Sequence, residues 1–582
     1  MSNLATKGTR QASSSEVIML AGLGGFWLIF MHICWPNHGG IGTALPGNML
    51  AWCFISGLCS LCWLRHPRTL QIKIGSSSPW LLSGAFLMSL PLLWSPSSAT
   101  LHYSLPRIAG LWAGLAFLLT LRQCQFSVLQ RLFLFYCVAI AGGVEAIIAL
   151  MELFGPTSWL PQTWQQLIQK YGRMGVGVFQ QVNLTSSFLA LSLAITLMLF
   201  GMRNATLGSR SKENIRLGLL AIMIIVVSAT LTLLYSRTGW LGGAGVVAGV
   251  YGLLSYSRFR QEGHYQWLLL LLPTIGISLG LGLMNLTLSQ ALAVHNGSNS
   301  QRLLTLYQTL RYALYHPIIG YGAGTYEGYY QAFLASLPGG NPGREIMSHP
   351  HNELLYQYAE GGFIALTGAL CWCVLYLRLW WKTQTLLQAG ALVAMLPVLL
   401  HTQVEYPFYY SVSHWLTLLL LLRLADAEQS AKSAEGTRKM VSIFGKSILF
   451  IVALYSSVVS FQSYRAGEIL DKFESAELAE PEQIATLYVP WIHCLRYKQD
   501  LTLLRLIRYQ KVPDKVSLGK FVQENQQWIT VHPWLPLYEN QIAVLRYLHD
   551  DAQAEYWLRQ ARLTMPWKKE FQRHKPKSNN QG

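Results

Sequence analysis

The amino-acid sequence predicts an all-α polytopic membrane protein with about 12–13 transmembrane helices. Hydrophobic residues make up 52% of the 582 residues and charged residues only 12%, against roughly a quarter charged in soluble domains. This number of charged side chains is too small to cover the surfaces of several soluble domains. We therefore expect the helices to bury their apolar faces in lipid and against one another. The formal net charge of +17 does not indicate nucleic-acid binding, because the basic residues form short groups between apolar runs.

Apolar runs of about 17 to 25 residues, long enough to cross a bilayer, recur through most of the chain. We place transmembrane helices 1–9 within residues 17–286 and helices 10–13 within residues 353–461. The thirteen runs are 17–35, 47–64, 79–95, 105–121, 129–151, 183–201, 217–235, 238–257, 265–286, 353–381, 386–402, 409–424 and 442–461. No small-residue cleavage site follows the first run, so we expect a retained helix and not a signal peptide.

Basic residues follow every second run and give one consistent orientation. Arg65 and Arg68 follow run two, and similar groups follow runs four, six, eight, ten and twelve. By the positive-inside rule, these loops and the N-terminal segment 1–16 are cytoplasmic. The remaining connections therefore face outward, and they are 36–46, 96–104, 152–182, 287–352, 403–408 and everything after 461.

Two of the outward segments are long enough to have structures of their own. Residues 287–352 form a loop far longer than an ordinary connector, and such loops are usually functional or disordered. We expect this large loop to be periplasmic and to carry active-site residues. Residues 462–582 contain amphipathic helical patterns, for example at 542–548 and 554–558. They predict a small soluble helical domain, also periplasmic, that is built from helical hairpins.

The segment Ser348-His349-Pro350-His351-Asn352-Glu353, at the outer mouth of run ten, is the first candidate for acid–base chemistry. A neutral imidazole at a water–lipid boundary accepts a proton near pH 7. Asn352 is a suitable N-cap for the helix that follows. The alternative account is a helix N-terminus with incidental histidines.

Outward-facing arginines are candidates for binding a phosphate-bearing lipid. Arg237 lies at the tight turn between runs seven and eight, Arg302 begins an Arg-x-x-x-Leu sequence in the large loop, and Arg173 precedes run six. An arginine at a dry boundary is costly unless it is paired, and its planar guanidinium fits phosphate oxygens. Snorkelling to lipid headgroups is the alternative, and we favour it for Arg107 at the outer end of run four.

Amides and carboxylates complete the set of outward polar groups. Gln181 and Asn183 precede run six and are suited to hydrogen-bonding sugar hydroxyls, although helix capping explains Asn183 equally well. Glu405 and Tyr406 follow run eleven in His-Thr-Gln-Val-Glu-Tyr-Pro, where Glu405 is placed to pair with an arginine or to orient a histidine. Glu145 lies inside run five, and an intramembrane carboxylate is a functional candidate. No P-loop, His-Glu-x-x-His or Asp-x-Asp pair is present, so the sequence does not favour a nucleotide-activated donor.

Together these segments resemble the O-antigen ligase superfamily, and within it the bacterial O-oligosaccharyltransferases that glycosylate pilins. The resemblance covers most of the chain. It includes the many spans, the long loop before the His-x-His-Asn-Glu segment, the His351-x10-Gly362 spacing, the arginine at an outer turn and Glu405-Tyr406-Pro407. The C-terminal domain is also similar to that branch. Where the branch usually has Gln-Pro-Asn before run six, this chain has Gln181-Val182-Asn183.

The resemblance implies that a preassembled glycan is moved from undecaprenyl pyrophosphate to a Ser or Thr hydroxyl of a pilin-like acceptor protein. The reaction would take place at the periplasmic face of a bacterial inner membrane, among membrane lipids, with neither a metal nor a cofactor. In this scheme His351 is the general base and His349 supports it. The residues implied to bind the pyrophosphate are Arg237, Arg302 and Arg173. Those implied to position the substrates are Gln181, Asn183, Glu405 and Tyr406.

Three alternatives use or carry the same lipid-linked donor. A lipopolysaccharide O-antigen ligase would have a lipid-bound sugar as its acceptor. An O-antigen polymerase would extend the glycan itself. A transporter of lipid-linked glycans would form no bond, but it would need charged residues along its whole path, and here they gather at the outer face.

Overall fold

The computed structural model describes residues 13–572, apart from 38, 41, 67–71, 203–208, 257–258, 260–265, 285–295, 427–436 and 476–483. Within this described part every regular element is a helix and there are no strands. The predicted all-α polytopic class is therefore confirmed.

A helix lies on each of the thirteen predicted apolar runs. Eight of the described helices are long and apolar enough to cross a membrane, four further apolar helices are shorter, and α9 is the glycine-rich thirteenth. The thirteen are α1 (Ser14–Leu28), α2 (Pro46–Arg65), α3 (Ser78–Ser89), α4 (Ser98–Gln123), α5 (Val128–Phe154), α7 (Val182–Gly201), α8 (Arg210–Leu233), α9 (Arg237–Ser255), α10 (Leu268–Met284), α14 (Glu353–Lys382), α15 (Leu386–His401), α17 (Val412–Ala425) and α18 (Thr437–Ser475).

Three helix boundaries differ from the sequence-based expectation. Helix α4 begins at Ser98 because Ser97 and Thr100 form a reciprocal capping box, so most of the predicted connection 96–104 is helical. Helix α18 is 39 residues long and passes the predicted domain boundary at 461. Helix α3 changes to a 3-10 turn at Leu90–Trp94, where Pro91 cannot donate a backbone hydrogen bond.

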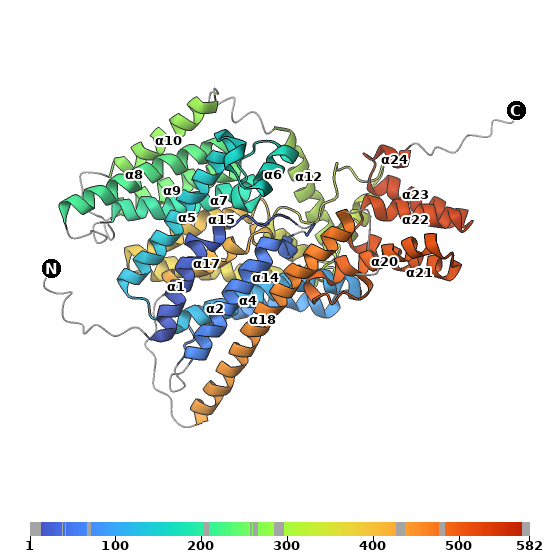
Figure 1. Ribbon diagram of the computed structural model, residues 1–582, viewed down its shortest axis with the longest axis horizontal. Coiled ribbons are helices and arrows are strands. Elements are labelled where there is room, and N and C mark those ends of the chain that lie inside the picture. Colours follow the sequence, from blue (N-terminus) through green and yellow to red (C-terminus); the bar gives the residue numbers. More distant parts are fainter. Residues whose placement is uncertain are drawn as a thin grey trace.

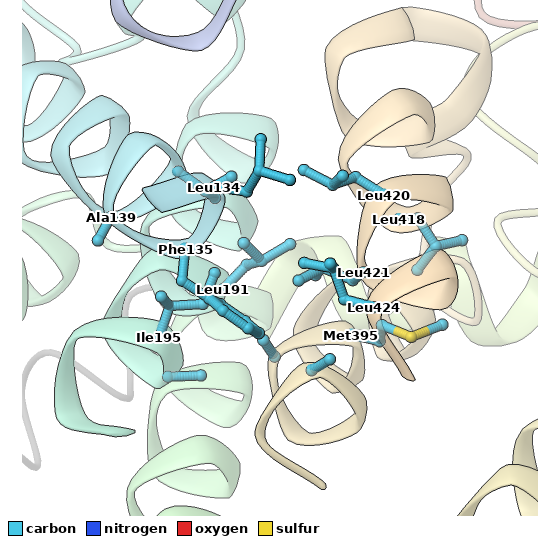
Figure 2. Close-up of a cluster of buried hydrophobic side chains, with 14 of the residues drawn as sticks. Leu134, Phe135, Ala139, Leu191, Ile195, Met395, Leu418, Leu420, Leu421 and Leu424 are labelled. Carbon is cyan, nitrogen blue, oxygen red and sulfur yellow. The ribbon is translucent and has the colours of Figure 1, made fainter. Parts of the chain in front are cut away.

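The core of the bundle lies where α5, α7, α15 and α17 meet. Figure 2 shows Leu134 and Phe135 of α5 beside Leu191 of α7, with Leu421 and Leu424 of α17 facing them. Along α7, every residue from position 184 to 200 is buried, so this helix contacts protein on all sides and little lipid. Such a helix is held by close packing and interhelical hydrogen bonds, because lipid supplies no hydrophobic drive between helices.

The connections predicted to face outward all gather at one end of the bundle, which we call the loop end. The Gln180 side chain donates to the carbonyl of Trp35 at 2.6 Å, and the Asn48 amide donates to the carbonyl of Tyr409 at 3.3 Å. The loop end also holds the short helices α6 (Gln162–Tyr171), α12 (Asn296–Ala313), α13 (Tyr326–Ala335) and α16 (Pro407–Tyr410). This common location agrees with the alternation predicted from the basic residues.

The C-terminal helices form consecutive hairpins that dock on the loop end. They are α20 (Cys494–Lys511), α21 (Lys515–Val531), α22 (Leu535–Tyr547), α23 (Asp551–Thr564) and α24 (Lys569–Gln572), drawn in orange to red at the right of Figure 1. Ala99 and Tyr103 of α4 pack into their hydrophobic core. Glu327 of α13 accepts hydrogen bonds from Tyr103 and from His532, each at 2.5 Å. The docked domain therefore contacts the same loops that carry the candidate site.

Candidate functional site

A break in α14 shapes the floor of the candidate site. Gly362 has φ of 58° inside the helix, in the left-handed region that a side chain disfavours. The chain from 317 to 322 fills the break, with Phe363 N–H donating to the Pro317 carbonyl at 2.9 Å and Gly322 N–H donating to the Glu360 carbonyl at 2.8 Å. The glycine at the end of the His351-x10-Gly362 spacing thus allows the large loop to pack against the helix.

The histidine segment caps the N-terminus of the same helix. Asn352 is the N-cap, as predicted, and its side chain accepts from Leu355 N–H at 2.9 Å. His349 is buried, with its ring centroid 4.5 Å from that of Tyr356 and 4.4 Å from that of Tyr406. Its Nδ1 accepts the backbone N–H of His351 at 3.0 Å, and its Nε2 lies 3.4 Å from Glu353 Oε2.

His351 has a different environment. Its φ of 59° places it in the left-handed region, and unusual backbone geometry of this kind gathers at functional sites. Its Nδ1 is buried and has no hydrogen-bond partner among the described residues. Burial and the neighbouring His349 lower the pKa of His351 to about 4, against the opposing effects of Glu405 and of the Val404 backbone.

The contacts of the two histidines differ. In neutral His349 the proton sits on Nε2, facing Glu353, because Nδ1 already accepts a backbone N–H. His351 Nδ1 has no hydrogen-bond partner among the described residues, so no neighbouring group uses its lone pair. A general base needs such a lone pair and a neutral ring. His351 meets both conditions, and His349 holds the backbone of His351 in place.

Glu405 is the hub that joins four residues from three segments of the chain. Its carboxylate accepts from Gln181 at 3.2 Å and Asn183 at 2.7 Å. Arg302 donates to it at 2.7 Å, and His401 Nε2 lies at 3.1 Å. Burial opposes its charge, but His401 and Arg302 overcome that effect and hold the pKa of Glu405 below its usual range. The predicted pairing of Glu405 with an arginine and with a histidine is therefore observed.

Helix capping, the alternative account of Asn183, is not what the structure shows. The N-cap of α7 is Gln181, which makes no side-chain capping bond. The Asn183 amide instead donates to Glu405, and its carbonyl oxygen accepts the Ser236 hydroxyl at 2.8 Å. Ser236 is the N-cap of α9, so Asn183 links Glu405 to the turn that carries Arg237.

A buried chain of hydrogen bonds behind Glu405 could not be recognised from the sequence. His401 Nδ1 lies 2.9 Å from the Ser187 hydroxyl, which lies 3.2 Å from His414 Nε2. His414 Nδ1 in turn lies 2.7 Å from the Ser411 hydroxyl. Each histidine nitrogen in this chain has a suitable partner when both histidines are neutral, provided that His401 donates its Nε2–H to Glu405. The only signal in the sequence is the polar residues at otherwise apolar positions of three helices.

Arg237 and Arg302 provide positive charge beside the hub. Arg237 is the first residue of α9, and it lies close enough to Arg302 for the two charges to repel. Arg302 belongs to α12 and is 30% exposed. The two guanidinium groups come from separate helices and add positive charge to this part of the loop end, and their planar shape suits anions with several oxygens.

Arg173 and Arg107 occupy different positions. Arg173 is exposed and donates to the carbonyls of Glu152 and Gly155, both at 2.9 Å, so it caps the end of α5. Its role in binding pyrophosphate stays a prediction. The expectation that Arg107 snorkels to headgroups is wrong, because Arg107 is buried and pairs with Glu360 at 2.5 Å. Burial beside a carboxylate removes it from the lipid surface.

A cavity of about 520 Å³ opens next to the hub. Gln181, Asn183 and Tyr406 form part of its lining. The Tyr406 ring also lies 5.6 Å from the ring of His351. Tyr406 therefore contacts the cavity and also lies near His351.

The fold and the candidate site define a polytopic membrane protein with a cluster of polar and charged side chains at one end of its helical bundle. A family model described as O-antigen ligase matches residues 220–370, and another, described as the C-terminal part of virulence-factor membrane-bound polymerases, matches residues 390–580. The first match contains Arg237, Arg302 and both histidines, and the second contains Glu405. No curated protein matches the chain.

The two matches support the O-antigen ligase superfamily, and with it a lipid-linked glycan transferase, ligase or polymerase. The candidate residues from Arg237 onward are divided between the two matched regions, whereas Arg173, Gln181 and Asn183 precede both. The family and the geometry therefore point to the same end of the molecule.

Proposed function

We propose that the protein is an O-oligosaccharyltransferase of the bacterial inner membrane. It moves a preassembled glycan en bloc from undecaprenyl pyrophosphate to a Ser or Thr hydroxyl of a periplasmic protein such as type IV pilin. The observation that carries the proposal is the convergence at Glu405. Arg302 donates to Glu405 at 2.7 Å, the adjacent Tyr406 ring lies 5.6 Å from the ring of His351, and His351 Nδ1 has no hydrogen-bond partner among the described residues. The loop end is then the periplasmic face.

The chemistry follows from these positions. The acceptor hydroxyl oxygen attacks the anomeric carbon of the first sugar, and its proton passes to His351 Nδ1. The bond between that carbon and the pyrophosphate oxygen breaks, and undecaprenyl pyrophosphate leaves. Arg237 and Arg302 stabilise the negative charge that develops on the leaving group. Because the arginines supply this charge and the donor bond supplies the energy, the proposal requires neither a metal nor ATP.

A second candidate comes from the family match at the C-terminal end. Its description names virulence-factor membrane-bound polymerases, so the acceptor could be another glycan chain. A lipopolysaccharide O-antigen ligase, with a lipid-bound sugar as acceptor, is a variant of the same chemistry. The site residues are the same in all three cases, and only the acceptor differs.

The first experiment identifies the acceptor. The intact mass of exported pilin and the lipopolysaccharide ladder are compared in cells with and without the gene. Loss of a glycan-sized mass from pilin with an unchanged ladder supports the proposal. Loss or shortening of the ladder with unchanged pilin refutes it and assigns a glycan or lipid acceptor.

Two variants then test the residue roles in the same cells. His351→Ala should abolish transfer while the protein still inserts in the membrane, because a loop residue contributes little to helix packing. Arg237→Lys should slow transfer about 10- to 100-fold, since a charged hydrogen bond contributes about 1.5–3 kcal/mol and an ammonium cannot reproduce the two-pronged contact. Normal transfer by His351→Ala would remove the base assignment, and wild-type rates with lysine would make Arg237 a lipid-headgroup contact.

A further inference from the structure

The cavity beside the hub has an uncharged and partly aromatic lining. It lies between the outer ends of α1 and α2 and the loop 172–183. Among its described lining residues there is no lysine or arginine, and the single carboxylate is Glu152. Both Glu152 oxygens are occupied, because they accept the N–H groups of Gly175 and Gly177 at 3.1 and 3.0 Å. A pyrophosphate would find no counter-charge in this space, so it is distinct from the arginine pair.

One wall of the cavity is held in an unusual conformation. Between 172 and 180 the backbone takes positive φ at Gly172, Gly175, Gly177 and Gln180. Glu152 holds this loop through two backbone N–H groups, and Glu145 holds it through Val178 N–H at 3.0 Å. The three glycines adopt positive φ without strain. Gln180 has a side chain, so its conformation is unfavourable unless the surroundings enforce it, and such positions gather at ligand-binding sites.

The lining also contains a hydrogen-bond donor without a partner among the described residues. Trp35 lines the cavity, and its indole Nε1 is buried without a hydrogen-bond partner among the described residues. A buried N–H group without a partner is unfavourable unless a ligand or water supplies the acceptor. The rings of Tyr406 and Tyr410 and the amides of Gln180 and Gln181 also line the space. Aromatic faces with amides and hydroxyls suit a neutral ligand that alternates C–H faces with hydroxyl groups.

We propose that this cavity binds neutral sugar residues of the donor glycan, close to the bond that breaks. The proposal deepens the function proposed above and rests on it. The volume of about 520 Å³ lies in the ordinary range for ligand sites, roughly 300–1,000 Å³. Tyr406 faces both the cavity and His351, so sugars in the cavity would lead directly to the general base.

Binding by the purified full-length protein tests the proposal. The first probe is the oligosaccharide released by mild acid from the cells' own polyprenyl pyrophosphate lipid. The second is the core oligosaccharide of lipopolysaccharide, an acceptor-type sugar. We expect the donor oligosaccharide to bind to the wild type and to His351→Ala alike. Trp35→Ala should weaken that binding at least tenfold, and Trp35→Phe should weaken it several-fold by removing only the indole N–H.

Trp159→Ala is the matched control, because Trp159 is also at the loop end but is 72% exposed and does not line the cavity. It should bind like the wild type. Trp35 packs on Phe30 and Tyr464, so thermal unfolding must show that Trp35→Phe is folded. Three results would overturn the proposal: no binding of the donor oligosaccharide, equal binding by both Trp35 variants and the wild type, or binding of the core oligosaccharide alone.

This test separates the cavity from the wider function. If pilin keeps its mass in cells without the gene but the donor oligosaccharide still binds through Trp35, the acceptor assignment fails and the cavity assignment stands. If pilin loses its glycan but Trp35 variants bind normally, the opposite holds.

Discussion

Replacing Gly362 with alanine should disrupt the floor of the site, and the cost can be estimated from the structure. At φ 58° and ψ −154° the backbone is in a region that essentially only glycine adopts, and a residue with a side chain would lose roughly 1–3 kcal/mol there. An added Cβ would lie 2.3 Å from the carbonyl carbon and oxygen of Ile318 and 2.6 Å from Ile319 N. These are backbone atoms, so the segment must move by about 1 Å to reach ordinary contact distances.

The movement would break hydrogen bonds across the helix break. Phe363 N–H to the Pro317 carbonyl and Tyr321 N–H to the Ala359 carbonyl contribute about 1 kcal/mol each. Together with the backbone term, the local cost of Gly362→Ala is about 3–5 kcal/mol. The loop around 317–324 should therefore open before the membrane helices unfold.

Hydrogen exchange measured by mass spectrometry tests this estimate. Amides in 317–324 should exchange about 10² to 10³ times faster in Gly362→Ala, and glycan transfer should fall. Gly245→Ala is the control, because nothing lies within 4 Å of its added Cβ and helical Gly→Ala is slightly stabilising. Unchanged exchange at 317–324 in Gly362→Ala would refute the reasoning.

Three further predictions follow from charges at the loop end. Because the pKa of His351 is about 4, kcat/KM should fall as the pH is lowered through about 4. A fall centred near pH 6.5 would contradict this prediction. Arg302→Met should raise KM for the lipid-linked donor at least tenfold while Arg311→Met, on the same helix, leaves it unchanged; equal effects would exclude a specific anion contact. Burial opposes the charge of His532, but the Glu327 carboxylate overcomes it and raises its pKa. The His532–Glu327 ion pair therefore stabilises the docked C-terminal helices fully below about pH 6.5. This stabilisation is lost as the pH rises through the raised pKa of His532. Hydrogen exchange in α21 should speed up over that range, and the same pH dependence in Glu327→Gln would contradict this.

The fold class and the positions of the helices could be predicted because they depend on local composition. An apolar run must form a helix in lipid, since no water is present to satisfy its backbone. The boundaries at Ser97, at Pro91 and within α18 were less predictable, because capping boxes and helix extensions depend on neighbouring side chains.

The candidate residues were predictable for a similar reason. Polar groups are conspicuous in a chain with so few charged residues, and they are expensive at a membrane boundary unless they have a role. His351, Arg237, Arg302 and Glu405 were therefore identified without knowledge of their partners. The same reasoning failed for Arg107, because its partner Glu360 lies 253 positions away in the sequence.

The sequence by itself determined that this is a helical membrane protein with a polar face at one end, because hydropathy and charge are properties of single residues and short segments. Only the tertiary structure decided which groups meet. Glu405 draws its partners from α7, α12 and α15, and His351 Nδ1 is buried without a hydrogen-bond partner among the described residues. The cavity is formed where loop 172–183 meets α1 and α2. Hydrogen bonds and ion pairs are properties of pairs of residues, and the pairs here are joined only when the helices pack.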